Sequence, residues 1–217
     1  MNNELIKRIF SSLILIPIAL FFIIKGSFLF NFFIIICFLV TSYEWHKMSG
    51  KKPYYLMGLL FLIISFYSTY KIRTSMGGEY IYFLIILLIC ISTDIGGYIF
   101  GRIFKGPKLT RISPKKTYSG VIGGYLFSII ILSLWFSSNL FLKPQELNSD
   151  VFIVILIIST VSQIGDIIIS YFKRLSKIKD TGKIIPGHGG LLDRIDGMIF
   201  AFPFAYIIFK INIFQHF

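Results

Sequence analysis

Long apolar runs separated by short polar segments make up most of this chain. A helix needs about 20 mostly apolar residues to cross the hydrocarbon core of a membrane, and about 17–25 are tolerated. Seven runs reach or approach that length, the first two being somewhat short: Ile9–Ile24, Ser27–Ser42, Tyr54–Tyr70, Tyr80–Phe100, Tyr118–Phe136, Val151–Phe172 and Gly197–Ile213. The pattern predicts an all-α, polytopic integral membrane protein with about seven transmembrane helices.

Composition agrees with a membrane protein and excludes an ordinary soluble domain. Of the 217 residues, 55% are hydrophobic and only 15% are charged, whereas soluble domains carry about 25% charge. The N-terminal run lacks the small-residue cleavage site of a signal peptide, so we interpret it as the first span. Because no repeat, low-complexity segment or soluble domain is visible, we predict one membrane domain over residues 1–217. Its N-terminal spans occupy residues 1–93, and its core with two basic loops occupies residues 94–217.

The basic residues are distributed unevenly over the two sides of the predicted membrane. The segments on the side of the N-terminus carry 17 of the 22 Lys and Arg residues. Because cytoplasmic loops are enriched in Lys and Arg, the N-terminus and the two long basic loops are predicted to be cytoplasmic. The formal net charge of +12 favours an anionic partner, although lipid headgroups alone would satisfy that charge.

The first basic loop, Gly101–Gly120, carries six basic residues and no acidic one, and Asp94 lies just before it. A Ser-Pro turn begins at Ser113, and Lys115 and Lys116 then precede the next span. Two adjacent ammonium groups, a hydroxyl and the backbone N–H groups of a helix start suit a polyphosphate ligand. The alternative is a basic loop that only anchors the span on the cytoplasmic side.

The second basic loop, Lys173–Asp196, is richer in candidate chemistry. Within Pro186–Gly190, glycines surround His188 and allow backbone N–H groups to approach a ligand closely, as phosphate-binding loops do. Asp193 and Asp196 are three residues apart at the start of the last predicted helix and therefore share a face. His188 is either a hydrogen-bonded loop residue or a proton-transfer group, and the sequence leaves both interpretations open.

Asp166 is an acidic residue inside a predicted span. A bare carboxylate in the hydrocarbon core costs about 2.5–3.5 kcal/mol on insertion scales. Helical spacing places Asp166 on one polar stripe with Ser162, Ser170 and Lys173, so it can face a polar cavity, open to the cytoplasm, next to Asp193. Carboxylate oxygens of this kind favour magnesium, which keeps some waters and shares substrate phosphates. The alternative is an ion pair with a Lys or Arg residue that only ties helices together.

The stretch SYFKRLSKIKDTGKIIPGHGGLLDRID, from Ser170 to Asp196, resembles the signature of the phosphatidate cytidylyltransferases, also called CDP-diacylglycerol synthases. Every fixed position of that signature is present: Ser170, Lys173, Arg174, Lys179, Asp180, Gly182, Pro186, His188, Gly189, Gly190, Asp193, Arg194 and Asp196. The segment from Asp94 to Gly120, which includes ISPKKT, is similar to the same family. The resemblance therefore covers about half of the chain, residues 94–196.

The resemblance implies a membrane enzyme that joins CTP and phosphatidic acid to give CDP-diacylglycerol and pyrophosphate, with its catalytic core in residues 94–217. In that family, two aspartates hold magnesium together with potassium; the matching positions are Asp166 and Asp193, with Asp196 assisting. The candidate catalytic residues are Asp166, Asp193, Asp196, His188 and Lys173. The expected substrate-binding residues are Asp94, Ser113, Lys115, Lys116, Ser170, Arg174, Lys179, Asp180, Gly189, Gly190 and Arg194.

The expected partners are CTP, phosphatidic acid and membrane lipids, with a homodimer left open and no nucleic acid. The expected location is the cell membrane, taken to be a bacterial inner (plasma) membrane, with a multi-pass chain whose active site faces the cytoplasm. Many members of the family carry more N-terminal membrane segments than this chain. Two other functions stay open. A CTP-dependent polyprenol or lipid kinase would transfer the γ-phosphate, and an anion-binding membrane transporter would also use an intramembrane acid and basic loops.

Overall fold

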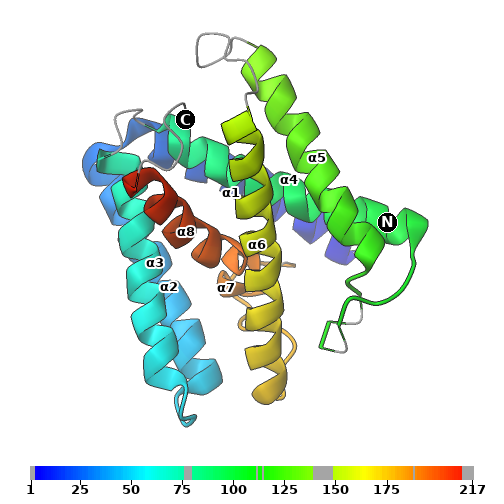
Figure 1. Ribbon diagram of the computed structural model, residues 1–217. Helices are drawn as coiled ribbons and strands as arrows, with labels where there is room; N and C mark the ends of the chain where they lie inside the picture. Colours follow the sequence, from blue (N-terminus) through cyan, green and yellow to red (C-terminus); the bar gives the residue numbers. More distant parts are fainter. Residues whose placement is uncertain are drawn as a thin grey trace. The chain divides into compact units, whose positions relative to one another are not determined.

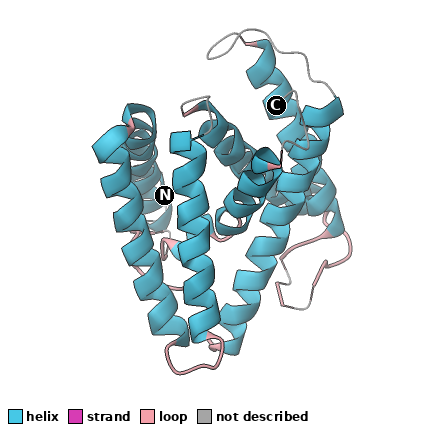
Figure 2. Cartoon of the chain, turned by 60° about the vertical axis from the view of Figure 1, so that its left-hand side comes forward, coloured by secondary structure: helices cyan, strands magenta, loops and turns pink. Residues whose placement is uncertain are grey.

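The computed structural model describes residues 3–75, 80–110, 112–113, 115–138, 149–187 and 189–211. Figure 1 labels the helices, which are α1 (Asn3–Lys25), α2 (Ser27–Ser49), α3 (Tyr55–Ser75), α4 (Ile81–Phe104), α5 (Tyr118–Ser137), α6 (Ser149–Leu175), α7 (Leu192–Ile195) and α8 (Met198–Lys210). Over the described residues the regular structure is helical (Figure 2), apart from two isolated β-bridges. The prediction of an all-α protein is confirmed.

Five of these helices are long and apolar enough to cross a membrane. They are α2, α3, α4, α5 and α6, and each matches one of the predicted runs. Two further apolar helices are shorter, Leu13–Lys25 within α1 and Met198–Lys210. With a rise of about 1.5 Å per residue, α8 alone covers less than the roughly 30 Å of a hydrocarbon core. The chain is therefore a polytopic membrane protein, and a total of seven spans stays a prediction.

Residue contacts divide the chain into two compact units, each built from two separate stretches. The first unit comprises Met1–Tyr80 and Phe172–Asp196, and the second comprises Ile81–Tyr171 and Gly197–Phe217. α6 therefore begins in the second unit and ends in the first. The first basic loop belongs to the second unit, and the second basic loop belongs to the first.

In the first unit, α2 packs against α1 and α3. The buried Trp45 of α2 contacts both the start of α3 and the last turns of α6. The Trp45 indole N–H donates a hydrogen bond of 3.0 Å to the backbone oxygen of Tyr55. The Trp45 ring also meets Phe172 edge-on, with 5.4 Å between ring centroids. The hydroxyls of Tyr54 and Ser176 lie 3.1 Å apart. These contacts fix the start of the second basic loop against α2 and α3.

In the second unit, glycines bring α4 and α5 into close contact. A Cβ atom added to Gly96 would lie 2.5 Å from the backbone oxygen of Gly123, and one added to Gly120 would lie 2.8 Å from the oxygen of Gly97. Small residues at such positions let helix backbones approach closely inside a membrane. The Thr117 hydroxyl caps the start of α5 by accepting a hydrogen bond of 3.1 Å from the Gly120 N–H. This packing fixes both ends of the first basic loop.

Candidate active site

Asp166 on α6 is paired with Lys116 of the first basic loop. The Lys116 Nζ atom lies 2.6 Å from the Asp166 Oδ2 atom and donates a hydrogen bond of 3.3 Å to the backbone oxygen of Gln163. One turn further along α6, the Ser170 hydroxyl donates to the Asp166 Oδ1 atom at 3.3 Å. The ion pair, one of the two alternatives left by the sequence, is therefore present. It offsets part of the cost of placing a carboxylate in an apolar helix.

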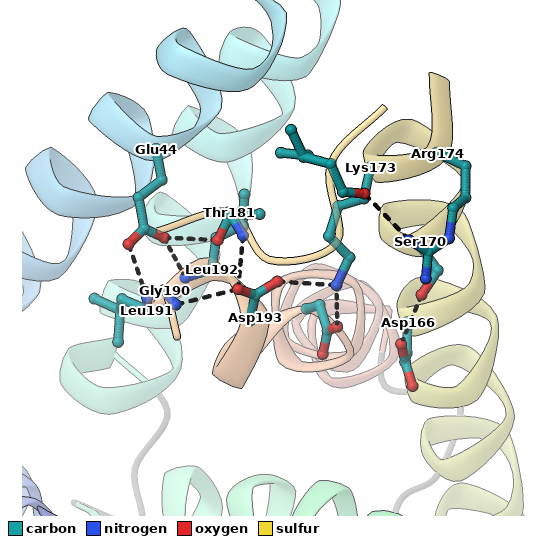
Figure 3. Close-up of polar contacts among 12 residues, drawn as sticks. Glu44, Asp166, Ser170, Lys173, Arg174, Thr181, Gly190, Leu191, Leu192 and Asp193 are labelled. Carbon is teal, nitrogen blue, oxygen red and sulfur yellow. Dashed lines mark hydrogen bonds and ion pairs between the residues drawn. The ribbon is translucent and has the colours of Figure 1, made fainter. Parts of the chain in front are cut away.

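Lys173, near the end of α6, is a buried lysine between two aspartates of the second basic loop. Its Nζ atom donates a hydrogen bond of 2.9 Å to Asp193 Oδ1 and lies 4.0 Å from Asp196 Oδ2. Figure 3 shows Lys173 and Asp193 pointing toward one another. Only 8% of the Lys173 surface is exposed, and a buried charge of this kind requires opposite charges close by. The structure thus brings together three of the candidate residues, Lys173, Asp193 and Asp196.

The second oxygen of Asp193 binds the backbone of the same loop. Asp193 Oδ2 accepts hydrogen bonds from the N–H of Thr181 at 2.7 Å and from the N–H of Gly190 at 3.1 Å. Burial raises the pKa of Asp193, but the hydrogen bonds and charge of Lys173 and these two N–H groups outweigh it. The net effect lowers the pKa of Asp193 below its ordinary value. Asp193 is therefore held as a carboxylate at neutral pH.

Glu44 of α2 contacts the same loop, although it was not among the predicted site residues. Glu44 Oε1 accepts a hydrogen bond of 3.0 Å from the Leu191 N–H. Glu44 Oε2 accepts one of 2.8 Å from the Leu192 N–H and one of 3.1 Å from the Thr181 hydroxyl (Figure 3). The residue is 1% exposed. The predicted span ended at Ser42, so Glu44 fell outside the predicted helix. A predicted helix that continued to Ser49 would have placed Glu44 on α2.

The glycine-containing part of the loop closes on itself. Ile185 and Gly189 exchange backbone hydrogen bonds of 2.9 and 3.1 Å. Gly187 and Gly189 have φ values of 75° and 93°, a region that side-chain-bearing residues rarely adopt. A Cβ atom at Gly189 would also lie 3.2 Å from Asp193 Oδ2. The predicted role of His188 falls on a residue that lies outside the described part of the chain.

The remaining candidates of the second unit lie in or beside the first basic loop. Asp94 and Lys115 are exposed, and Ser113 is half-buried. The Ser113 N–H donates a hydrogen bond of 3.1 Å to the hydroxyl oxygen of Thr110. The Ser113 backbone oxygen accepts one of 3.0 Å from the Lys116 N–H. The serine therefore shapes the turn that presents Lys116, and its substrate contact stays a prediction.

The remaining candidates of the first unit lie on the surface of the second basic loop. Arg174, Lys179, Asp180 and Arg194 are exposed. The Arg174 guanidinium donates a hydrogen bond of 3.2 Å to the backbone oxygen of Ile178. The exposed cations Arg174, Lys179 and Arg194 are accessible to an anionic ligand. The substrate contacts of all four residues stay predictions.

The carboxylates of Asp166 and Asp193 suit a hard cation, because their oxygens have lone pairs beyond those that the protein uses. Among the described residues, no group of three or more His, Cys, Asp or Glu side chains is placed to hold a metal. Such a group is not required, because Mg²⁺ is usually bound through one or two carboxylates together with waters and substrate phosphates. The residues fit magnesium by their chemistry, while magnesium and potassium binding stay predictions.

Comparison with known proteins identifies relatives along nearly the whole chain. Residues 54–212 match the cytidylyltransferase family. A phosphatidate cytidylyltransferase of Rickettsia felis is 35% identical over 219 residues, which cover 95% of this chain and 93% of the relative. One from Rickettsia typhi is 36% identical over 98% of this chain and 94% of the relative. One from Staphylococcus saprophyticus is 38% identical over 70% of this chain and 57% of the relative. The chain therefore belongs to the cytidylyltransferase family, among its phosphatidate cytidylyltransferases.

Proposed function

We propose that this protein transfers the CMP portion of CTP to phosphatidic acid and releases pyrophosphate, giving CDP-diacylglycerol. The observation that carries the proposal is the 35% identity to a phosphatidate cytidylyltransferase over 95% of this chain and 93% of that relative. The signature positions lie in the segment where Lys173, Asp193 and Asp196 meet. A membrane protein with a polar site of this kind suits a reaction between a soluble nucleotide and a lipid.

The reaction requires charge stabilisation more than it requires a base. A phosphate oxygen of the lipid forms a bond to the α-phosphorus of CTP, and the bond between that phosphorus and the bridging oxygen to the β-phosphate breaks. The pair of electrons leaves with pyrophosphate. The attacking oxygen is already anionic, so no proton has to be removed from it. Two polyanions repel each other, however, and cationic groups that hold both of them lower the barrier.

The cations that the chain itself offers are lysine and arginine side chains of the two basic loops. Lys116 and Lys173 are each paired with an aspartate, and an ammonium has three N–H donors, so each can also donate to a phosphate oxygen. Exposed Lys115, Arg174 and Lys179 add positive charge. We assign these residues, with Ser113 and the loop Pro186–Gly190, to binding the phosphates of CTP and phosphatidic acid.

We assign Asp166 and Asp193 to holding Mg²⁺, with Asp196 as a supporting ligand and K⁺ as the second ion. Bound Mg²⁺ would neutralise charge on the phosphates that it shares with these carboxylates. The low pKa of Asp193 supports this assignment, because a metal ligand of this type must be ionised. The lysine partners keep both carboxylates oriented before the substrates arrive.

The active site is proposed to face the cytoplasm of a bacterial cell. This orientation places the loops with the most Lys and Arg on the inner side of the membrane. It also gives the site access to CTP, which is a cytoplasmic nucleotide. The size of the purified protein in detergent tests whether two copies of the chain associate.

Labelled CTP distinguishes the proposed reaction from the two alternatives. Purified protein is incubated in vesicles that contain phosphatidic acid, with Mg²⁺ and CTP labelled at either the α- or the γ-phosphorus. Cytidylyl transfer predicts lipid-soluble label from the α-position only, together with labelled pyrophosphate from the γ-position. Lipid-soluble label from the γ-position would instead favour a lipid kinase. Anion flux into vesicles without any labelled lipid would favour a transporter.

A further inference from the structure

We propose that Glu44 is a positioning residue, which holds the second basic loop so that the Asp193 carboxylate keeps its place in the site. The proposal deepens the proposed function and rests on it, because it takes Asp193 as part of the reaction site. Glu44 lies near the end of α2, far in sequence from the signature segment, and contacts that segment through three hydrogen bonds.

The donors to Glu44 come from two separate parts of the loop. The Thr181 hydroxyl lies in its first half, while the N–H groups of Leu191 and Leu192 lie in its second half. All three donors are neutral groups, and Glu44 as a whole residue is 1% exposed. A buried carboxylate must be hydrogen-bonded to be tolerated, so Glu44 and the loop require each other. Glu44 thereby joins the two halves of the loop.

Asp193 uses the adjacent backbone groups of the same two parts. Its Oδ2 atom accepts hydrogen bonds from the N–H of Thr181 and the N–H of Gly190. Thr181 therefore donates its hydroxyl to Glu44 and its N–H to Asp193. The consecutive N–H groups of residues 190–192 are divided between the same two carboxylates. A shift of the loop at Glu44 would move the backbone that orients Asp193.

Two glycines of the signature segment make room for Glu44. A Cβ atom added to Gly182 would lie 2.5 Å from Glu44 Oε1. One added to Gly190 would lie 2.6 Å from Glu44 Oε2 and closer still to the hydroxyl oxygen of Thr181, which donates to the same carboxylate. Real Cβ atoms do not approach an oxygen this closely, so a side chain at either position would displace Glu44 or Thr181. The loop and the end of α2 therefore have complementary shapes, as expected of a contact that positions the loop.

The geometry requires a carboxylate at residue 44 and not merely a polar side chain. Both oxygens of Glu44 accept a hydrogen bond from a backbone N–H. In Glu44→Gln one oxygen becomes an NH₂ group, which cannot accept, so one backbone N–H faces another donor. Leaving a buried donor unsatisfied is costly. The isosteric variant therefore loosens the loop without creating a cavity.

The test compares Glu44→Gln with Thr41→Val in the full-length protein. Thr41 is also buried in α2, but its hydroxyl donates to backbone oxygens of its own helix, those of Cys37 and Phe38. Three quantities are measured for folded protein in detergent or vesicles. They are CMP transfer, the Mg²⁺ concentration that gives half-maximal transfer, and amide hydrogen exchange over residues 181–192 in the presence of EDTA.

For Glu44→Gln we expect transfer to fall by about 10- to 100-fold, and the Mg²⁺ requirement to rise by a similar factor, as for lost partners of a metal ligand. Amide exchange should accelerate over residues 181–192 and stay unchanged over α3. Thr41→Val should match the wild type in all three quantities. Glu44→Asp, which keeps both oxygens on a shorter chain, should recover part of the lost transfer.

The proposal is overturned if Glu44→Gln matches Thr41→Val, or if transfer falls while loop exchange and the Mg²⁺ requirement stay at their wild-type values.

If the Glu44 variants do not fold, Thr181→Val replaces them, since it removes one hydroxyl and keeps the N–H that Asp193 binds. It should reduce transfer by less than Glu44→Gln does, because it removes one of the three hydrogen bonds to Glu44, and loop exchange should be faster; an unchanged loop would overturn the proposal. If the wild type shows no CMP transfer, the proposed function fails, and the exchange measurement, made without metal or substrate, still decides whether Glu44 holds the loop.

Discussion

Glu44 and Asp193 both accept a hydrogen bond from Thr181. The hydroxyl of Thr181 lies 3.1 Å from Glu44 Oε2, and its backbone N lies 2.7 Å from Asp193 Oδ2. A single residue therefore connects the end of α2 with the carboxylate that also binds Lys173. The second basic loop is held by carboxylates on both of its halves, and these hydrogen bonds stabilise a segment that contains several glycines.

Removal of either proposed metal ligand should abolish CTP-dependent transfer. In Asp166→Asn and Asp193→Asn the neutral amide binds Mg²⁺ much less well than a carboxylate does. The measurement is lipid-soluble label from α-labelled CTP, with size-exclusion chromatography to confirm folding. Asp150→Asn is the matched control, because Asp150 lies in the first turn of the same helix α6, and it should stay active. Full activity in the Asp166 or the Asp193 variant would contradict the metal assignment.

Loss of Lys116 should affect catalysis more than stability. The Lys116 and Asp166 side chains are 24% and 28% exposed, so the ion pair is partly solvated and contributes less to the free energy of unfolding than a fully buried pair would. Transfer by Lys116→Met should fall about 10- to 100-fold, as expected for a lost hydrogen bond to a charged phosphate. Lys108→Met, an exposed position of the same loop, is the control. Equal activity of both variants would remove Lys116 from the site.

Loss of Lys173 should affect stability strongly. Lys173→Met leaves Asp193 without its buried cation and should lower the free energy of unfolding by about 3–5 kcal/mol. The exposed Lys183 serves as control, and Lys183→Met should change that free energy by less than about 0.5 kcal/mol. The double variant Lys173→Met with Asp193→Asn should be less destabilised than the sum of the single variants. Denaturant unfolding in detergent measures the four variants and the wild type, and strict additivity would show that the pair is not coupled.

A side chain at Gly190 should not be accommodated. The added Cβ atom of Gly190→Ala would lie 2.6 Å from Glu44 Oε2 and closer still to the Thr181 hydroxyl oxygen, and overpacking of this kind costs about 1–3 kcal/mol. Gly97→Ala is the comparison, because its Cβ atom would lie 3.5 Å from the nearest atom, an ordinary contact distance. Thermal unfolding of both variants measures the effect. An unchanged midpoint for Gly190→Ala would show that the loop and Glu44 can separate freely.

The helices were predictable because each apolar run is continuous, but their ends were not. α2 continues to Ser49, beyond the predicted end at Ser42, because Trp45 and Met48 are buried and their packing extends the helix past the apolar run. That extension carries Glu44 to the second basic loop. Hydropathy identifies the residues that face lipid. Glu44, Trp45 and Met48 are instead buried against other parts of the protein, so the sequence pattern could not assign Glu44 to the site.

The candidate site was predictable in its residue types and less so in its partners. The polar stripe on α6 correctly indicated that Asp166 needs a cation, but Lys116, fifty residues earlier in the sequence, is chosen by tertiary packing. Gly96 had no role in the prediction; the structure shows that it allows α4 and α5 to approach, because a Cβ atom there would lie 2.5 Å from the backbone oxygen of Gly123. Spacing along one helix reveals which residues share a face of that helix. Which residues of different segments contact one another can be known only from the folded structure.

The most direct test of the central claim follows the α-phosphorus of CTP. Purified protein is placed in vesicles with phosphatidic acid, Mg²⁺ and CTP labelled at the α- or the γ-position, and the lipid phase is extracted and counted. The account predicts lipid-soluble label from α-labelled CTP, none from γ-labelled CTP, and loss of the product on chelation of Mg²⁺. Label that enters the lipid from the γ-position, or no labelled lipid at all from folded protein, would contradict it.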